Sequence, residues 1–141
     1  MLVVVSEDPR FDDLLAGLPL GVFKNRTPEL GISRSISIGL RALPADSPAA
    51  LIAVADQPYL TADALTKLIG AFSPGRIVVP RYGEHLGNPP VFDRRFFPEL
   101  LALEGDRGGQ SVISAHPDAV VEVHLAAAMG ADIDTPDDWQ D

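Results

Sequence analysis

The stretch ALIAVADQPYL, residues 50–60, indicates which fold the chain adopts. Six apolar residues lead directly into Asp56, Gln57 and Pro58. A strand that is apolar on both faces is typical of a sheet covered by helices on both sides. We therefore predict a buried strand over residues 49–55 that ends at the Asp56 carboxylate. Pro58 ends the strand, because proline has no backbone N–H to donate.

Strand-like and helix-like segments alternate along the rest of the sequence. Runs rich in valine and isoleucine predict further strands at residues 2–5, 21–25, 76–80 and 119–125. Apolar residues at helical spacing predict helices near residues 11–18, 32–43, 62–72, 97–101 and 112–113. In the third helix we expect Thr61 as the N-cap and a buried stripe of Leu65, Leu68, Ile69 and Phe72. This alternation predicts one α/β domain over residues 1–141, with a mostly parallel sheet between two layers of helices.

Composition excludes several classes of protein. Hydrophobic residues make up 46% of the chain, which excludes a disordered protein. The net charge of −9 and the scattered arginines argue against a nucleic-acid partner. No apolar run reaches the ~20 residues that span a bilayer, so we expect no membrane segment. The first residues do not resemble a signal peptide and there are no cysteines, so we expect a cytoplasmic location.

Asp56 is the first candidate functional residue. In open α/β sheets, ligands bind beyond the carboxyl ends of the strands, where this carboxylate is predicted to lie. Such a position suits a metal ion or a polar ligand. The alternative is structural: Asp56 caps a loop or pairs with an arginine.

Three further segments carry a resemblance to a known family: LGISRSISIGLRAL (residues 30–43), RYGEHLGNPPVFDRRFFPELLALEGDRGGQSVI (81–113) and GADIDTPDDW (130–139). Together with DQP they resemble, in order and spacing, the molybdopterin nucleotidyltransferases. The most similar branch is the cytidylyltransferase of molybdenum cofactor synthesis. The resemblance covers about residues 3–138 and implies a three-layer, Rossmann-like sheet of the nucleotidyltransferase type.

The resemblance also implies a reaction. CMP, or GMP, would pass from a nucleoside triphosphate to the phosphate of molybdopterin, with Mg²⁺ and release of pyrophosphate. Asp56 would be the catalytic metal ligand, and Asp132 or Asp134 would be the second contact. As strand residues, Asp132 and Asp134 would point to the same face. The segment 135–138 also fits the start of a helix, so part of this motif can be structural.

The resemblance assigns ligand binding to three loops, which contain Ser33 and Ser35; Gly87, Asn88 and Pro89; and Asp106 and Arg107. The serines begin a helix near the nucleotide, although helix capping would explain them equally well. The second loop would face the pterin, or be an ordinary turn. The guanidinium of Arg107 could hold a phosphate by paired hydrogen bonds, or could pair with Asp106 at the surface.

One family motif does not occur in these 141 residues. It is a first strand running into a glycine-rich phosphate loop, L-A-A-G-x-S-x-R-M-G, followed by a lysine. Met1 falls where the second strand of the family begins, so we expect an N-terminally truncated fold with at most trace nucleotidyl transfer. Two other functions stay open: a non-catalytic remnant that binds a pterin or a partner protein, and a nucleotidyltransferase for sugar or isoprenoid precursors. We also expect the strand at residues 3–5 to pair directly with the strand at 51–54, or a second copy to supply the contact in a homodimer.

Overall fold

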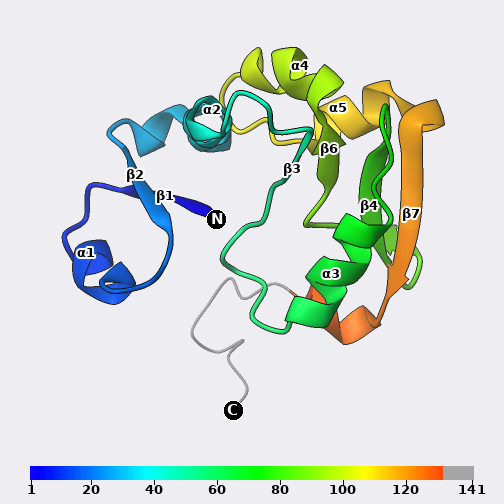
Figure 1. Cartoon of the computed structure of the whole chain (residues 1–141), viewed down its shortest axis with the longest axis horizontal. Helices are drawn as coiled ribbons and strands as arrows, with labels where there is room; N and C mark the ends of the chain where they lie inside the picture. The colour runs from blue at the N-terminus through cyan, green and yellow to red at the C-terminus, as the bar shows by residue number, and fades with distance from the viewer. Residues whose placement is uncertain (132–141) are drawn as a thin grey trace. The chain divides into compact units, whose positions relative to one another are not determined.

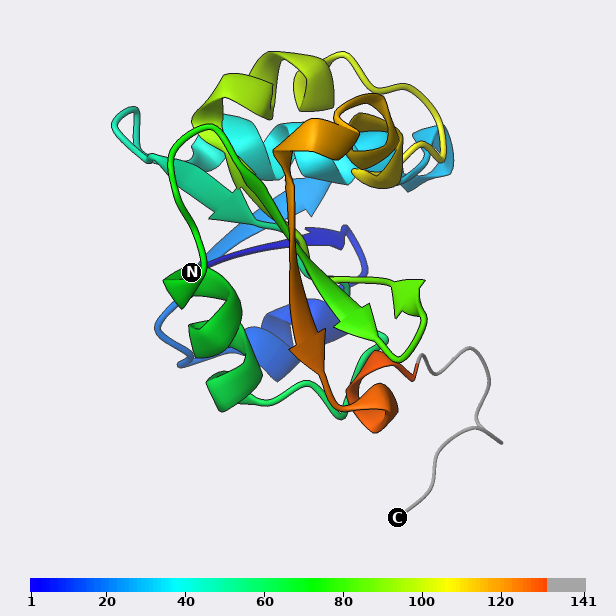
Figure 2. The ribbon, with the colours of Figure 1, turned by 90° about the vertical axis from the view of Figure 1, so that its right-hand side faces the viewer.

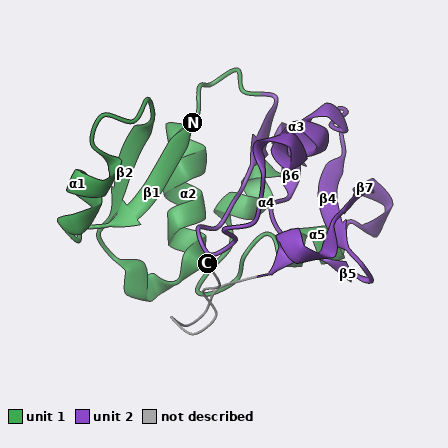
Figure 3. Ribbon diagram, turned by 90° about the horizontal axis from the view of Figure 1, so that it is seen from below, with its two compact units in different colours: residues 1–47, 96–115 green, residues 48–95, 116–141 purple. Residues whose placement is uncertain are grey.

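The computed structural model describes residues 1–131, which alternate between helices and strands (Figure 1). The chain divides into two compact units (Figure 3). Unit 1 comprises residues 1–47 and 96–115, and unit 2 comprises residues 48–95 and 116–141. In the described residues, no helix combines the length and the apolar character needed to cross a membrane.

Unit 1 holds a pair of parallel strands and a group of helices. Its elements are β1 (Leu2–Ser6), α1 (Arg10–Leu15), β2 (Gly21–Asn25), the 3-10 turn η1 (Pro28–Leu30), α2 (Ile32–Ala42), α4 (Phe97–Leu101) and α5 (Gln110–Ala115). β1 and β2 pair in register from Leu2 opposite Gly21 to Ser6 opposite Asn25. α2 packs against both strands and against α4. The buried apolar residues of the unit come from its helical segments: Ile36, Leu40, Phe96, Leu100, Val112 and Ile113.

Unit 2 holds a five-stranded mixed sheet. Its elements are β3 (Ala49–Leu51), α3 (Ala62–Gly70), β4 (Ile77–Tyr82), β5 (His85–Leu86), β6 (Val91–Asp93), η2 (Arg94–Phe96, which crosses into unit 1), η3 (Pro117–Ala119), β7 (Val120–Leu125) and η4 (Ala127–Gly130). The strand order is β3-β6-β4-β5, and β7 pairs with β4. β4 and β7 run parallel and lie side by side in Figure 2, whereas the other pairs are antiparallel.

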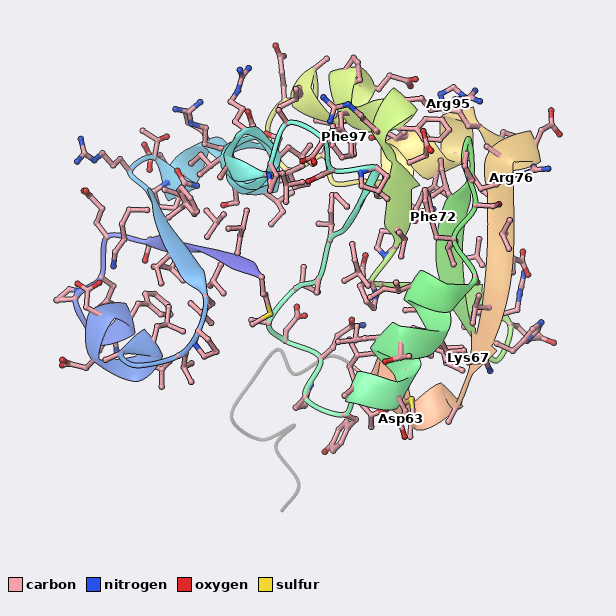
Figure 4. All side chains as sticks on the ribbon, in the orientation of Figure 1. Asp63, Lys67, Phe72, Arg76, Arg95 and Phe97 are labelled. Atoms are coloured by element: carbon pink, nitrogen blue, oxygen red, sulfur yellow. The ribbon has the colours of Figure 1, made fainter. Side chains whose placement is uncertain are left out.

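α3 packs on β4 and β7, and its buried face completes the core of unit 2. Leu68 is fully buried among Val78, Val91 and Val123, one from each of three strands. On the edge of the helix, the Lys67 ammonium donates to the His124 carbonyl oxygen on β7 at 2.8 Å (Figure 4). Burial of large apolar side chains between helix and sheet is what stabilises this unit.

The α/β class predicted from the sequence is confirmed, and most of the predicted elements form. The buried stripe predicted for α3 is partly wrong: Ile69 is 58% exposed, whereas Ala64 and Leu68 are the buried residues of this helix. The reason is helical geometry, because Ala64 and Leu68 lie four residues apart on one face. Ile69 lies about 100° further round the helix from Leu68.

The prediction that the strand at residues 49–55 extends to Asp56 is wrong. β3 ends at Leu51, opposite Val91 of β6. The next N–H, that of Ile52, donates to the Pro90 carbonyl oxygen at 3.0 Å, but Pro90 has no N–H to return. Pro89 precedes it with the same defect, so the antiparallel ladder cannot continue.

Direct pairing of the first strand with the strand at residues 51–54 is also wrong. Within the described residues, β1 pairs with β2 alone and β3 with β6 alone. The predicted partner strand is mostly missing, because β3 ends at Leu51 and residues 52–54 are not in a strand. The alternative, a homodimer, stays a prediction.

Candidate functional site

The carboxyl ends of β1 and β2 carry a buried polar side chain. Asn25, the last residue of β2, is only 2% exposed. Its Oδ1 accepts the Thr27 N–H at 3.0 Å, and its Nδ2 donates to the Ser35 Oγ at 3.0 Å. Asn25 therefore joins the strand end, the turn after it and the second turn of α2. Sequence reasoning missed this residue, although an asparagine directly after an apolar strand is a signal for such a turn.

The N-terminus of α2 packs against the glycine loop that follows α4. Gly31 has a φ of +89°, and a Cβ built on it would collide with the backbone of Gly105. The Ser33 N–H donates to the Gly105 carbonyl oxygen at 3.2 Å, and Ser33 itself is 5% exposed. Two of the three predicted ligand loops are thus brought together in unit 1: the loop that contains Ser33 and Ser35, called the serine loop below, and the loop at residues 105–109.

Asp106 and Arg107 lie exposed on this glycine loop. The predicted alternative, an ion pair between their side chains, is not formed: the structure pairs neither side chain with another described residue. The Arg107 backbone N–H donates to the Glu104 carbonyl oxygen at 3.4 Å, which fixes the turn. The Arg107 guanidinium therefore has its five donors available for an anion.

Ion pairs surround the same end of the two-stranded sheet. Arg26 pairs with Glu7 at 3.0 Å and Lys24 with Asp12 at 2.7 Å. Hydrogen bonds from Arg10 hold the pKa of the Asp8 carboxyl well below its usual range, at about 2. These six charged residues are therefore paired with one another within unit 1.

Asp56 lies in unit 2, exposed in a turn rather than at the end of a strand. Its neighbour Gln57 is 8% exposed, and no described residue hydrogen-bonds the buried Oε1 of Gln57. Further along, the predicted N-cap forms, because the Ala64 N–H donates to the Thr61 Oγ1 at 3.2 Å. Asp56 thus has the exposure that a metal ligand needs, while the residues after it are fixed.

The loop at residues 87–89 is held against β4 from two sides. The Gly87 N–H donates to the Pro80 carbonyl oxygen at 3.0 Å, and the Tyr82 hydroxyl donates to the Asn88 carbonyl oxygen at 2.7 Å. A Cβ at Gly87 would lie 2.9 Å from the Tyr82 ring, so only glycine fits there. Pro89 is buried and the Asn88 side chain is exposed, which makes Asn88 the group of this loop that a ligand can reach.

The predicted metal site can be assessed only in part. Asp132 and Asp134 lie outside the described residues. Up to residue 131, no group of three or more histidine or acidic residues could hold a metal ion. Mg²⁺ takes one or two protein carboxylates and completes its shell with water and phosphate oxygens, so the exposed Asp56 fits one position of such a shell.

The sequence matches one protein family over most of its length. Residues 1–120 match the model of the MobA-like NTP transferase domain. The chain belongs to this family. The family is one of nucleotidyltransferases, so a nucleotide is the expected class of substrate. No curated protein matches the sequence.

Solved structures agree with the fold. Rv0371c from Mycobacterium tuberculosis H37Rv is similar with a TM-score of 0.82 at 22% identity, over 97% of this chain and 71% of that one. A nucleotidyl transferase from Methanothermobacter gives 0.83 at 17% identity, over 97% and 68%. The 4-diphosphocytidyl-2C-methyl-D-erythritol synthase of Anaerococcus prevotii gives 0.76 at 18% identity, over 97% and 74%. A second structure of Rv0371c is a complex with manganese.

Proposed function

We propose that this MobA-like domain acts in molybdenum cofactor synthesis, in the transfer of CMP, or GMP, from a nucleoside triphosphate to the phosphate of molybdopterin. The observation that carries the proposal is the group of polar side chains at the carboxyl ends of β1 and β2 and at the start of α2. There, a glycine loop and the buried Asn25 hold Ser33 and Ser35 at the start of α2. The reaction needs no protein nucleophile, because the acceptor phosphate attacks the α-phosphorus and pyrophosphate leaves.

The residues of this chain would position the reactants and balance their charge, which is most of what such a transfer requires. Ser35 would present a hydroxyl to phosphate oxygens, and Arg107 a guanidinium that pairs with no other described residue. In unit 2, Asp56 would hold the metal and Asn88 would face the pterin. A bound Mg²⁺ would neutralise charge on the phosphates.

A binding experiment tests this proposal without depending on turnover. Titration calorimetry of the 141-residue chain with CTP and Mg²⁺ should show binding that Arg107→Gln weakens by about ten-fold, the effect of losing one charge-assisted hydrogen bond. GTP in the same titration distinguishes the two nucleotides. Binding of neither nucleotide at millimolar concentration would overturn the proposal. Pyrophosphate release with molybdopterin present, which we expect at no more than a trace rate from these 141 residues, then tests the acceptor.

The metal ligands need a separate titration. The manganese complex of Rv0371c supports the use of a divalent ion in this fold. We expect Mn²⁺ or Mg²⁺ to bind the chain weakly and Asp56→Ala to abolish that binding. Asp46→Asn, which removes an exposed carboxylate in unit 1, is the control. Separate Asp132→Asn and Asp134→Asn variants would show which aspartate contributes. Equal binding by Asp56→Ala would place the metal elsewhere.

Nucleotidyl transfer to an isoprenoid precursor is the second candidate. It is favoured by the fold similarity to the 4-diphosphocytidyl-2C-methyl-D-erythritol synthase. The two candidate functions differ in their acceptor. Pyrophosphate release from CTP with methylerythritol phosphate, and none with molybdopterin, would support the isoprenoid-precursor function. Binding of molybdopterin without any nucleotide binding would instead identify a non-catalytic pterin-binding protein.

A further inference from the structure

The orientation of the Asn25 side-chain amide is fixed by the backbone. The Thr27 N–H needs an acceptor, and the Asn25 oxygen lies 3.0 Å from it. The Thr27 hydroxyl donates to the same oxygen at 3.5 Å. The amide nitrogen therefore faces Ser35, where it can only donate.

This orientation sets the role of the Ser35 hydroxyl. The Ser35 Oγ accepts from Asn25, so its own proton stays available. A serine inside a helix commonly gives that proton to the carbonyl four residues earlier, here Gly31. The Gly31 oxygen accepts the Arg34 N–H at 3.2 Å, and the structure shows no hydrogen bond from the Ser35 hydroxyl to that oxygen. In the described part of the chain, nothing accepts the Ser35 proton. Since Ser35 is only half-buried, its hydroxyl is an accessible donor.

We propose that Asn25 is a positioning residue that holds the Ser35 hydroxyl as a hydrogen-bond donor to a phosphate oxygen of the nucleotide. This inference rests on the proposed function, because it takes the nucleotide as the ligand of the serine loop. In this arrangement a residue buried behind the loop determines whether the Ser35 hydroxyl donates or accepts a hydrogen bond.

Asn25→Asp tests the inference with almost no change of shape. The aspartate keeps an oxygen for the Thr27 N–H, but it places an acceptor where the amide nitrogen stood. Ser35 must then donate to the aspartate and present lone pairs to the ligand. We expect CTP with Mg²⁺ to bind about 10- to 100-fold more weakly, the range for a lost hydrogen bond to a charged group.

A double-mutant cycle separates this mechanism from a general effect of the new charge. Ser35→Ala alone should weaken CTP binding by about ten-fold or more. Adding Asn25→Asp to Ser35→Ala should change binding by less than about two-fold, because the hydroxyl through which Asn25 acts is gone. Thr66→Ala removes an exposed hydroxyl from α3 and should leave CTP affinity unchanged.

The outcomes distinguish the two proposals. If the wild-type chain binds no CTP, the proposed function and this inference both fall. If it binds CTP and Asn25→Asp weakens binding equally with and without the Ser35 hydroxyl, this inference alone falls.

If Asn25→Asp does not fold, a measurement on the wild-type chain still tests the inference. The chain has two asparagines and three glutamines, so the side-chain amide signals of Asn25 are among five and can be assigned by NMR. They should shift when CTP binds, and this response should disappear in Ser35→Ala. Unchanged Asn25 signals at saturating CTP would overturn the inference.

Discussion

The two sheets of the molecule bury opposite kinds of side chain. In the five-stranded sheet, Val78, Val91 and Phe92 are almost or completely buried. In the two-stranded sheet of β1 and β2, the buried residue is Asn25, and the other nine residues are half-buried or exposed. Two strands alone are marginally stable in water. The five-stranded sheet is therefore stabilised by the burial of apolar side chains, whereas β1 and β2 place polar groups and the apolar core of unit 1 lies in its helices.

The largest effect should come from emptying the core of the five-stranded sheet. Phe92→Ala removes a fully buried ring from β6 and should lower the free energy of unfolding by about 3–5 kcal/mol. Phe23→Ala makes the same change on β2, where the ring is only half-buried, and should cost less than half as much. Urea denaturation of both variants measures the difference. Equal losses would contradict this difference between the two sheets.

A smaller loss is expected where the serine loop meets the glycine loop. Gly31→Ala places a Cβ against the Gly105 backbone and 2.7 Å from the Asp106 nitrogen, at a φ of +89°. It should cost about 2–4 kcal/mol, from left-handed backbone strain together with the clash. Gly17→Ala is the matched control, since its φ is +77° but no atom lies within 4 Å of the new Cβ. Gly17→Ala should lower the free energy of unfolding only by the backbone strain, about 1–2 kcal/mol. If denaturation gives the same loss for both, the two loops do not pack tightly.

These contacts mark the limit of what the sequence could predict. The regular spacing of apolar residues was enough to predict the alternating helices and strands and the burial of Leu68. An element that buries one face has apolar residues at a regular spacing in its sequence. The end of β3 could not be predicted from residues 49–55, because it is set by two prolines almost forty residues later in the chain. Contact between the serine loop and residues 105–109 is likewise long-range, and only the resemblance suggested that both loops bind ligand. The Asn25 bond to Ser35 depends on side-chain geometry that no local pattern contains.

Among the described residues, two side-chain amides are buried, one in each unit, and they differ in their hydrogen bonds. Asn25→Leu leaves the Thr27 N–H without its acceptor and should cost about 1–3 kcal/mol. Gln57→Met removes an oxygen that has no partner among the described residues, at nearly constant volume. It should leave the free energy of unfolding unchanged or raise it by about 1 kcal/mol. Denaturation of both variants checks the contrast. A loss above about 2 kcal/mol in Gln57→Met would mean that its oxygen is bonded in solution.

The smallest effects should come from two ion pairs, one in each unit. Asp8 and Arg10 lie two residues apart, whereas Glu122 and Arg81 join β7 to β4 across 41 residues. Both carboxyls have lowered pKa values, because each accepts hydrogen bonds from its arginine, and the pKa of Asp8 is about 2. A carboxylate with a lowered pKa stabilises the fold above its unfolded pKa and loses that contribution as the pH falls through the folded pKa.

The two ion pairs should differ in whether they can still form in the unfolded chain. Asp8 and Arg10 are close in sequence and can still meet after unfolding, whereas Arg81 and Glu122 cannot. We therefore expect Arg10→Gln to raise the Asp8 pKa toward its ordinary value in an NMR titration while hardly changing the urea midpoint. Arg81→Gln should raise the Glu122 pKa and also reduce the loss of stability between pH 6 and pH 3. An equal change of the acid-dependent loss in both variants would contradict the argument, because it would mean that the local pair does not survive unfolding.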